Sequence, residues 1–203
     1  MNRGAVALAC LVASVAVTGA SHRKEEVVQP PPLQVIPAGQ TLAERLAFVH
    51  AALLVRVAGP AQSRAVDISG ALQRSSPGVA LRPVVMVVTE SDVVVLEAFK
   101  SHGAMMTGAR VRIATIGGRA KWGGRDLMIR RRAPDLEAGA TYLVMLRDEQ
   151  EWETPMFVDD DVFRIEGGRV AAPRLARETS YAKELAGLSE TDAIEHVRRA
   201  SGK

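Results

Sequence analysis

Cysteine is almost absent from this chain of 203 residues, which holds a single thiol, Cys10. Cys10 lies in an N-terminal segment that we expect to be removed, so we expect the mature protein to have no thiol. Cysteine nucleophiles, disulfide bonds and cysteine-ligated zinc sites all need that side chain. The sequence therefore predicts that the protein uses none of these chemistries.

Aromatic residues and excess charge are scarce as well. Aromatic residues make up 4% of the chain, and 26 basic against 23 acidic side chains give a net charge of only +3. Proteins that bind nucleic acids commonly combine a strong basic excess with several aromatic side chains on which bases stack. Most of the aromatic residues here fall in apolar runs and are expected in the core. We therefore expect no nucleic-acid partner.

Motifs for catalysis, metal binding and phosphate binding are missing too. The chain has no G-x-S-x-G elbow, no glycine-rich phosphate loop, and no H-x-x-x-H or H-E-x-x-H pair among its four histidines. The prediction is a protein without catalytic residues, metal or cofactor. The alternative is an envelope hydrolase that uses Glu90, Asp92 or Glu97, because a carboxyl group with a raised pKa can act as a general acid.

Residues 1–20 have the pattern of a signal peptide. Arg3 supplies a positive charge, an uncharged run follows from Ala5 to Val17, and small residues lead up to Ala20. As a helix this run spans about 20 Å, short of the roughly 30 Å of a bilayer core. We expect cleavage near Ala20, a secreted or periplasmic location, and no transmembrane segment in the mature chain.

Cys10 follows Ala7-Leu8-Ala9, a sequence that loosely resembles a lipobox. Only nine residues precede this cysteine, and a hydrophobic stretch follows it. We therefore expect no lipid anchor at Cys10. Residues 21–38 are charged and then proline-rich, with Pro30-Pro31-Pro32. We interpret them as an extended linker, and the alternative is a docking motif for a proline-binding domain.

Alternating and continuous apolar runs predict a mainly β domain over residues 39–175. Val84–Val88 and Val93–Phe99 are either one long bent strand or a hairpin, and residues 66–83 are predicted to be a long loop. Thr41 and Glu44 form a capping box at the start of a short helix. The other predicted strands are His50–Val57, Arg110–Ile116, Leu127–Ile129, Thr141–Leu146, 156–158, 162–165 and 170–172.

Helices are predicted in the C-terminal tail, residues 176–203. Thr179–Ala186 has a helical composition and is followed by Gly187, a residue typical of helix C-termini. Ser189 and Asp192 then form a second capping signal, for a helix that ends near Ala200.

Three segments carry a resemblance to a known fold. Val93–Lys100 is followed by Val111-Arg112-Ile113 and Gly117-Gly118, and then by Pro134–Val144. This order over residues 47–172 resembles the OB-like barrel of exported bacterial proteins, which is similar to the netrin module and to tissue inhibitors of metalloproteinases. Together with the strand lengths and the helix signals above, the sequence predicts a mainly β, OB-like closed Greek-key barrel with a short N-terminal helix and C-terminal helices.

The metalloproteinase inhibitors use an N-terminal cysteine and several disulfide bonds, and this chain has neither. A protease-inhibitor-like domain nevertheless stays an alternative.

Two blocks of opposite charge follow one another in the sequence. Residues 110–132 contain eight basic residues and one acid, whereas residues 148–161 contain seven acids and no base. If the blocks lie side by side, they form ion pairs that guide strand pairing. If they lie apart, the acidic block could bind calcium, and the basic block could bind an anion through charge-assisted hydrogen bonds.

The leading hypothesis is an exported, non-catalytic module that binds an anionic envelope ligand or a protein partner. We expect the binding surface in a flexible basic loop at residues 119–125 and in the basic run that follows. The candidate binding residues are Arg119, Lys121, Trp122, Arg125, Arg130, Arg131 and Arg132.

Overall fold

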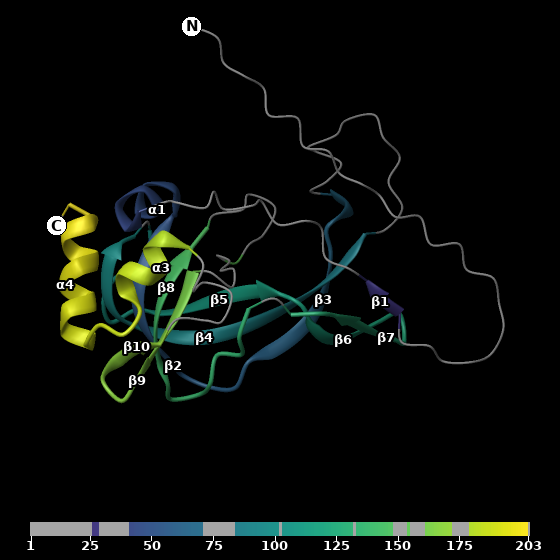
Figure 1. Cartoon of the computed structure of the whole chain (residues 1–203). Coiled ribbons are helices and arrows are strands. Elements are labelled where there is room, and N and C mark those ends of the chain that lie inside the picture. The colour runs from purple at the N-terminus through teal and green to yellow at the C-terminus, as the bar shows by residue number, and fades with distance from the viewer. Residues whose placement is uncertain are drawn as a thin grey trace, which may run out of the picture.

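The computed structural model describes residues 26–28, 41–70, 84–101, 103–131, 133–147, 154, 161–171 and 179–202. These residues form a mainly β protein with a seven-stranded sheet, a three-stranded sheet and three helices (Figure 1). The large sheet contains β2 (Ala51–Val57), β3 (Gln62–Asp67), β4 (Val85–Lys100), β5 (Arg110–Ile116), β8 (Thr141–Leu146), β9 (Val162–Glu166) and β10 (Arg169–Ala171). The small sheet contains β1 (Glu26–Val28), β6 (Gly118–Trp122) and β7 (Arg125–Ile129), and the helices are α1 (Leu42–Phe48), α3 (Ser180–Leu185) and α4 (Glu190–Ala200).

Strand β4 organises the large sheet. It is one continuous strand of 16 residues. Of the two alternatives for Val84–Phe99, one long strand or a hairpin, the structure therefore shows the long strand. Strands β2 and β3 pair with successive halves of one edge of β4, and β5 pairs with the other edge. The polar stretch 89–92 therefore does not form a turn, because strands on either side satisfy its backbone hydrogen bonds.

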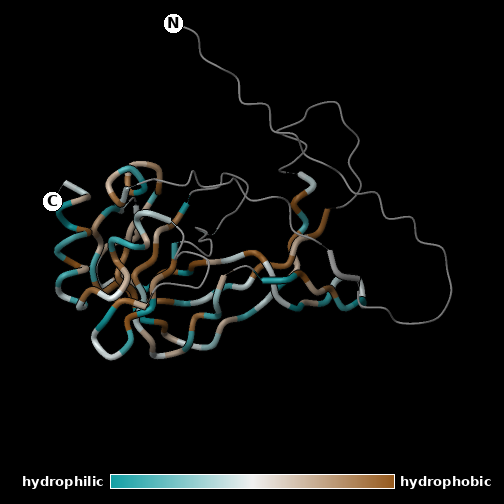
Figure 2. Tube along the Cα trace, in the orientation of Figure 1, coloured by the Kyte–Doolittle hydropathy of each residue, from teal (hydrophilic) through white to brown (hydrophobic). Residues whose placement is uncertain are grey.

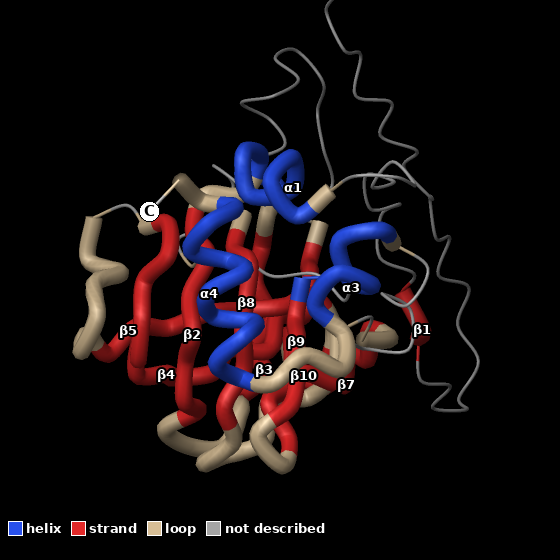
Figure 3. Tube along the Cα trace, turned by 60° about the vertical axis from the view of Figure 1, so that its left-hand side comes forward, coloured by secondary structure: helices blue, strands red, loops and turns tan. Residues whose placement is uncertain are grey.

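The large sheet buries hydrophobic side chains on both faces, and hydrophobic and hydrophilic residues lie side by side along its strands (Figure 2). Ala52 and Leu54 of β2 contact the cluster that includes all three helices, which cover one side of the sheet (Figure 3). Leu53 and Val55 point into a second cluster on the opposite face. This arrangement follows from the period of two along a strand.

The three helices begin where the sequence predicts. Thr41 and Glu44 form a complete capping box at α1, and the Ser189 hydroxyl accepts a hydrogen bond from the Asp192 amide at α4. Helix α3 contributes Tyr181 and Leu185, both fully buried, to the same core as α1. No helix in the described part of the chain has the length and apolarity needed to cross a membrane.

The expected closed barrel is not confirmed. In the described residues the pairing runs from β10 through β9, β8, β2 and β4 to β3, with β5 also on β4, and no pairing joins the two ends of this path. The segment after β7 covers part of the second cluster instead, because Ala133 and Leu136 are buried there together with Ile113 of β5. The coarser prediction, a mainly β fold with an N-terminal helix and C-terminal helices, is confirmed.

Two further expectations concern loops. Residues 66 and 67 belong to strand β3 rather than to the predicted long loop, and β3 as a whole was not predicted. Its polar, half-exposed residues hide the alternation that identifies a strand, and it forms because the edge of β4 is open beside it. Residues 71–83 and the predicted strand at 156–158 lie outside the described residues.

Candidate functional site

The predicted basic loop is a β-hairpin. Strands β6 and β7 pair in antiparallel register from Gly118↔Ile129 to Trp122↔Arg125, and Gly123 and Gly124 form the turn. Both glycines have positive φ, 55° and 77°, as a tight primed turn requires. The expectation of a flexible loop at residues 119–125 is therefore wrong. Gly123 and Gly124 form a tight turn, and this turn allows the residues on either side of it to pair as antiparallel strands.

The hairpin distributes its side chains over two faces. Cross-strand partners share a face, so Lys121 and Asp126 lie on one side and Trp122 and Arg125 on the other. The Trp122 side also carries Ala120 and Leu127, which pack against a small apolar cluster at the end of β4. The predicted basic surface is thus divided between two faces.

A chain of hydrogen bonds attaches the base of the hairpin to the large sheet. Arg131 donates to the Ser63 hydroxyl at 3.2 Å, the Ser63 and Thr89 hydroxyls lie 2.8 Å apart, and Thr89 donates to the Gly117 carbonyl at 2.6 Å. A Cβ atom on Gly118 would lie 2.5 Å from both hydroxyl oxygens. Only glycine permits this close contact, so the base of the hairpin is fixed in place.

The sequence contained a partial signal for this attachment. Consecutive glycines at 117 and 118 suggested a turn, but both have φ above 100° and lie against Arg131, Ser63 and Thr89. Neither hydroxyl residue was a candidate, because Ser63 and Thr89 are distant in sequence and meet only through the β3–β4 pairing.

The predicted site residues differ in their surroundings. Trp122 is 42% exposed, and Lys121, Arg125 and Arg130 are exposed and form no ion pair within the described part of the chain. Arg119 is exposed and its guanidinium lies 3.6 Å from the sulfur of Met128. Arg131 instead forms an ion pair with Asp135. Arg132 lies outside the described residues.

The hypothesis that the two charge blocks face each other stays a prediction, because Asp161 is the only acid of residues 148–161 that the structure describes. Asp161 is buried and forms ion pairs with Arg45 and Arg147, which are outside the basic block. Of the basic block, Arg112 pairs with acids of β4.

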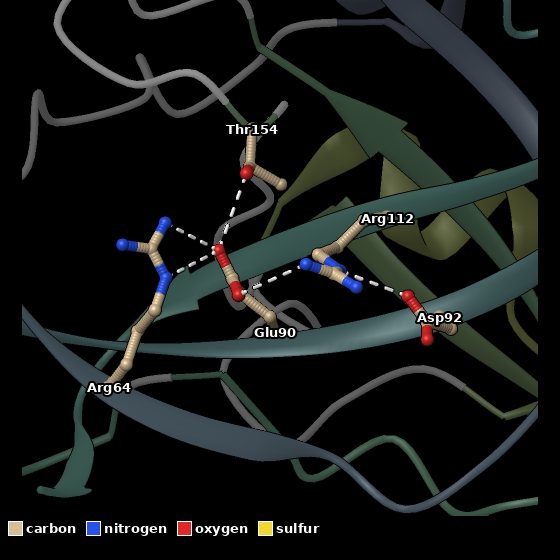
Figure 4. A network of polar contacts seen from close by, with 5 residues as sticks. All are labelled: Arg64, Glu90, Asp92, Arg112 and Thr154. Carbon is tan, nitrogen blue, oxygen red and sulfur yellow. Dashed lines mark hydrogen bonds and ion pairs between the residues drawn. The ribbon is translucent and has the colours of Figure 1, made fainter.

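A polar network formed by residues of β3, β4 and β5 and by Thr154 surrounds Glu90, which is buried (Figure 4). Arg64 donates from Nε and Nη2 to Glu90 Oε1 at 3.0 and 2.8 Å, and Thr154 donates to the same oxygen at 3.4 Å. Arg112 donates to Asp92 at 3.0 Å and lies 3.9 Å from Glu90 Oε2. The hydrogen bond to Asp92 and the charges of Asp92 and Glu90 raise the pKa of Arg112.

The third candidate carboxylate of the alternative hypothesis, Glu97, is engaged in the same way. Arg198 of α4 donates to its two oxygens at 2.7 and 2.9 Å, and this contact raises the pKa of Arg198. Glu90, Asp92 and Glu97 therefore all accept hydrogen bonds from arginines. The three carboxylates thus connect β4 to β3, β5 and α4 through ion pairs.

Metal-ligating side chains do not gather in the described ranges, where no group of three or more His, Cys, Asp and Glu residues is placed to hold an ion. His196 contacts Glu184, with 3.1 Å between Nε2 and Oε2, and Glu184 also accepts a hydrogen bond from the Leu42 amide at the start of α1. These contacts connect α4, α3 and α1.

Comparisons with known proteins give no identification: no protein-family model matches the chain, and no curated protein matches it.

Proposed function

We propose that this protein is an exported, non-catalytic binding module with an OB-like β fold, and that its β6–β7 hairpin holds an anionic ligand of the cell envelope. One observation carries the proposal. Lys121 and Arg125 are exposed beside the partly exposed Trp122, and neither forms an ion pair within the described residues.

Unpaired cations are favourable for binding because no internal ion pair has to break when the ligand arrives. Arg112 and Arg198, by contrast, already donate to carboxylates at 3.0 and 2.7 Å. A phosphate or carboxylate on the ligand would compete with those acids, whereas Lys121 and Arg125 have no ion-pair partner among the described residues that it would have to displace. Charge-assisted hydrogen bonds from such groups are roughly twice as strong as neutral ones.

The fixed base of the hairpin also supports a binding role. The contacts of Gly118 with Ser63 and Thr89 hold β6 against the sheet before any ligand is present. A surface that is already ordered loses less conformational entropy when it binds than a mobile loop does. The hairpin is therefore better suited to binding than the flexible loop that the sequence suggested.

The test is binding of polyphosphate, a soluble polyanion, measured by calorimetry. We compare the double variant Lys121→Ala/Arg125→Ala with a control, Arg56→Ala/Arg110→Ala, which removes the same charge from exposed arginines on β2 and β5. Measurements at ionic strengths of about 0.01 M and 0.15 M vary the screening length from about 30 Å to about 8 Å.

We expect the wild type and the control variant to bind at low salt, with weaker binding at higher salt, and the hairpin variant to lose binding. Equal losses in both double variants would show that net charge alone attracts the polyanion. That result, or binding that does not change with salt, would contradict the proposal.

A further inference from the structure

Cations occur on both faces of the hairpin close to its tip. Lys121 lies on the face that it shares with Asp126, and Arg125 lies on the opposite face with Trp122. A polymer chain that lay along one face would contact the cations of that face alone. A layer of anionic groups that surrounds the tip would contact both. The distribution of charge therefore favours a broad anionic surface over a single chain.

The shape of the hairpin points in the same direction. It lies at the end of the molecule away from the three helices (Figure 1). A Cβ atom added to either turn glycine, Gly123 or Gly124, would have no other described part of the protein within 4 Å. Binding sites for small ligands are typically concave and surround most of the ligand. Strand β1 pairs with β7 only at Leu127–Ile129, so the tip extends beyond this pairing and is suited to contact with an extended surface.

Trp122 gives the chemical character of that surface. The apolar side of the hairpin begins with Ile129, which is buried, continues with Ala120 and Leu127, which are partly buried, and ends with Trp122, which is 42% exposed. Tryptophan is enriched where a membrane meets water, because its ring is apolar and its N–H can still donate. Lysine and arginine near an anionic bilayer are attracted to its head groups.

We propose that the tip of the β6–β7 hairpin docks on the surface of an anionic lipid bilayer. Trp122 would lie at the level of the head groups, with Lys121 and Arg125 against lipid phosphates on either side. This inference rests on the proposed function and names the ligand as a lipid surface rather than a soluble polymer.

The experiment uses the full chain with Trp152→Phe, which leaves Trp122 as its only tryptophan. Its fluorescence is recorded during titration with vesicles of phosphatidylglycerol, with vesicles of phosphatidylcholine, and with polyphosphate. The apolar run Ala5–Val17 would bind both kinds of vesicle and would therefore contribute equally to both titrations. The fluorescence of Trp122, compared between phosphatidylglycerol and phosphatidylcholine vesicles, reports the contribution of the hairpin.

We expect a blue shift of Trp122 emission, and quenching by brominated lipid, with phosphatidylglycerol vesicles only. Adding Lys121→Ala and Arg125→Ala should weaken partitioning onto phosphatidylglycerol vesicles by about 30-fold. Each cation near an anionic surface contributes a factor of about five, and the two factors multiply. The control pair Arg56→Ala/Arg110→Ala should change it by less than about fivefold.

The outcomes separate the two proposals. Binding of polyphosphate through Lys121 and Arg125, without a blue shift on phosphatidylglycerol vesicles, would overturn the lipid inference and leave the proposed function standing. A blue shift of equal size with both lipids would also overturn it, because charge would then play no part. Absence of polyphosphate binding, together with no blue shift of Trp122 on either kind of vesicle, would overturn both proposals.

Discussion

Replacement of Asp161 tests how the helices are joined to the sheet. Its side chain is fully buried, and Arg45 of α1 donates from Nε to Oδ1 at 2.8 Å and forms a second contact with Oδ2. The hydroxyl of Tyr181 in α3 donates to Oδ1 at 3.3 Å, and Arg147 after β8 lies 3.7 Å from Oδ2. One carboxylate thus contacts two helices and the end of a strand.

We expect Asp161→Leu to lower the free energy of unfolding by about 3–5 kcal/mol, because it takes a carboxylate away from Arg45, which is only 4% exposed. This loss is a large part of the roughly 5–15 kcal/mol that stabilises a typical domain. The double variant Arg45→Met/Asp161→Leu should lose less, about 1–3 kcal/mol, since it removes both members of the buried pair and leaves only the lost contacts of the Tyr181 hydroxyl and of Arg147 with Asp161.

The assay is urea unfolding of the full chain followed by circular dichroism, with the double-mutant cycle calculated from the fitted free energies. The double variant must be more stable than Asp161→Leu alone if charge burial explains the loss. Equal or lower stability of the double variant would refute the reasoning, as would a loss below about 1 kcal/mol in Asp161→Leu.

Two further predictions concern single positions. Gly118→Ala should destabilise the protein by about 1–3 kcal/mol through overpacking and backbone strain. Gly124→Ala should destabilise it less, because Gly124 also has positive φ but has open space around it. Thermal unfolding of the two variants compares these losses. Hydrogen bonds from the Ser69 side chain and amide lower the pKa of Asp67. The stability they give is present above the unfolded-state pKa of Asp67 and is lost as the pH falls through its lower folded-state pKa. Ser69→Ala should therefore raise this pKa in a carbon-detected NMR titration, and an unchanged value would contradict the assignment.

The elements that the sequence predicts well are those set by local contacts. The capping box at Thr41 and the cap at Ser189 involve residues three positions apart, and Gly187, which follows the end of α3, has the positive φ that glycine adopts readily. Each signal and its structural consequence lie within one turn of chain. Long-range packing is not needed to produce them, so they are visible in the sequence.

The features that the sequence does not predict depend on distant partners. Strand β4 continues through residues 89–92 because β3 and β5 flank it, and β3 itself forms on an edge that only the folded sheet provides. The candidate site follows the same rule. Its residue types were predicted, but their division between two faces of a hairpin depends on the register of β6 and β7.

The basic block shows why a count of charges is a poor guide to a binding surface. Arg112 and Arg131 belong to the block, yet each forms an ion pair with an acid outside the acidic block, Asp92 and Asp135 respectively. Their charge is largely compensated within the protein. Lys121 and Arg125 have no such partner in the described residues, and neither do Arg110 and Arg130, so the charge of these four side chains is not compensated there by an ion pair. Cations of equal formal charge within one block are therefore unequal in their contribution to binding, because pairing strength and not sequence position decides which of them remain available.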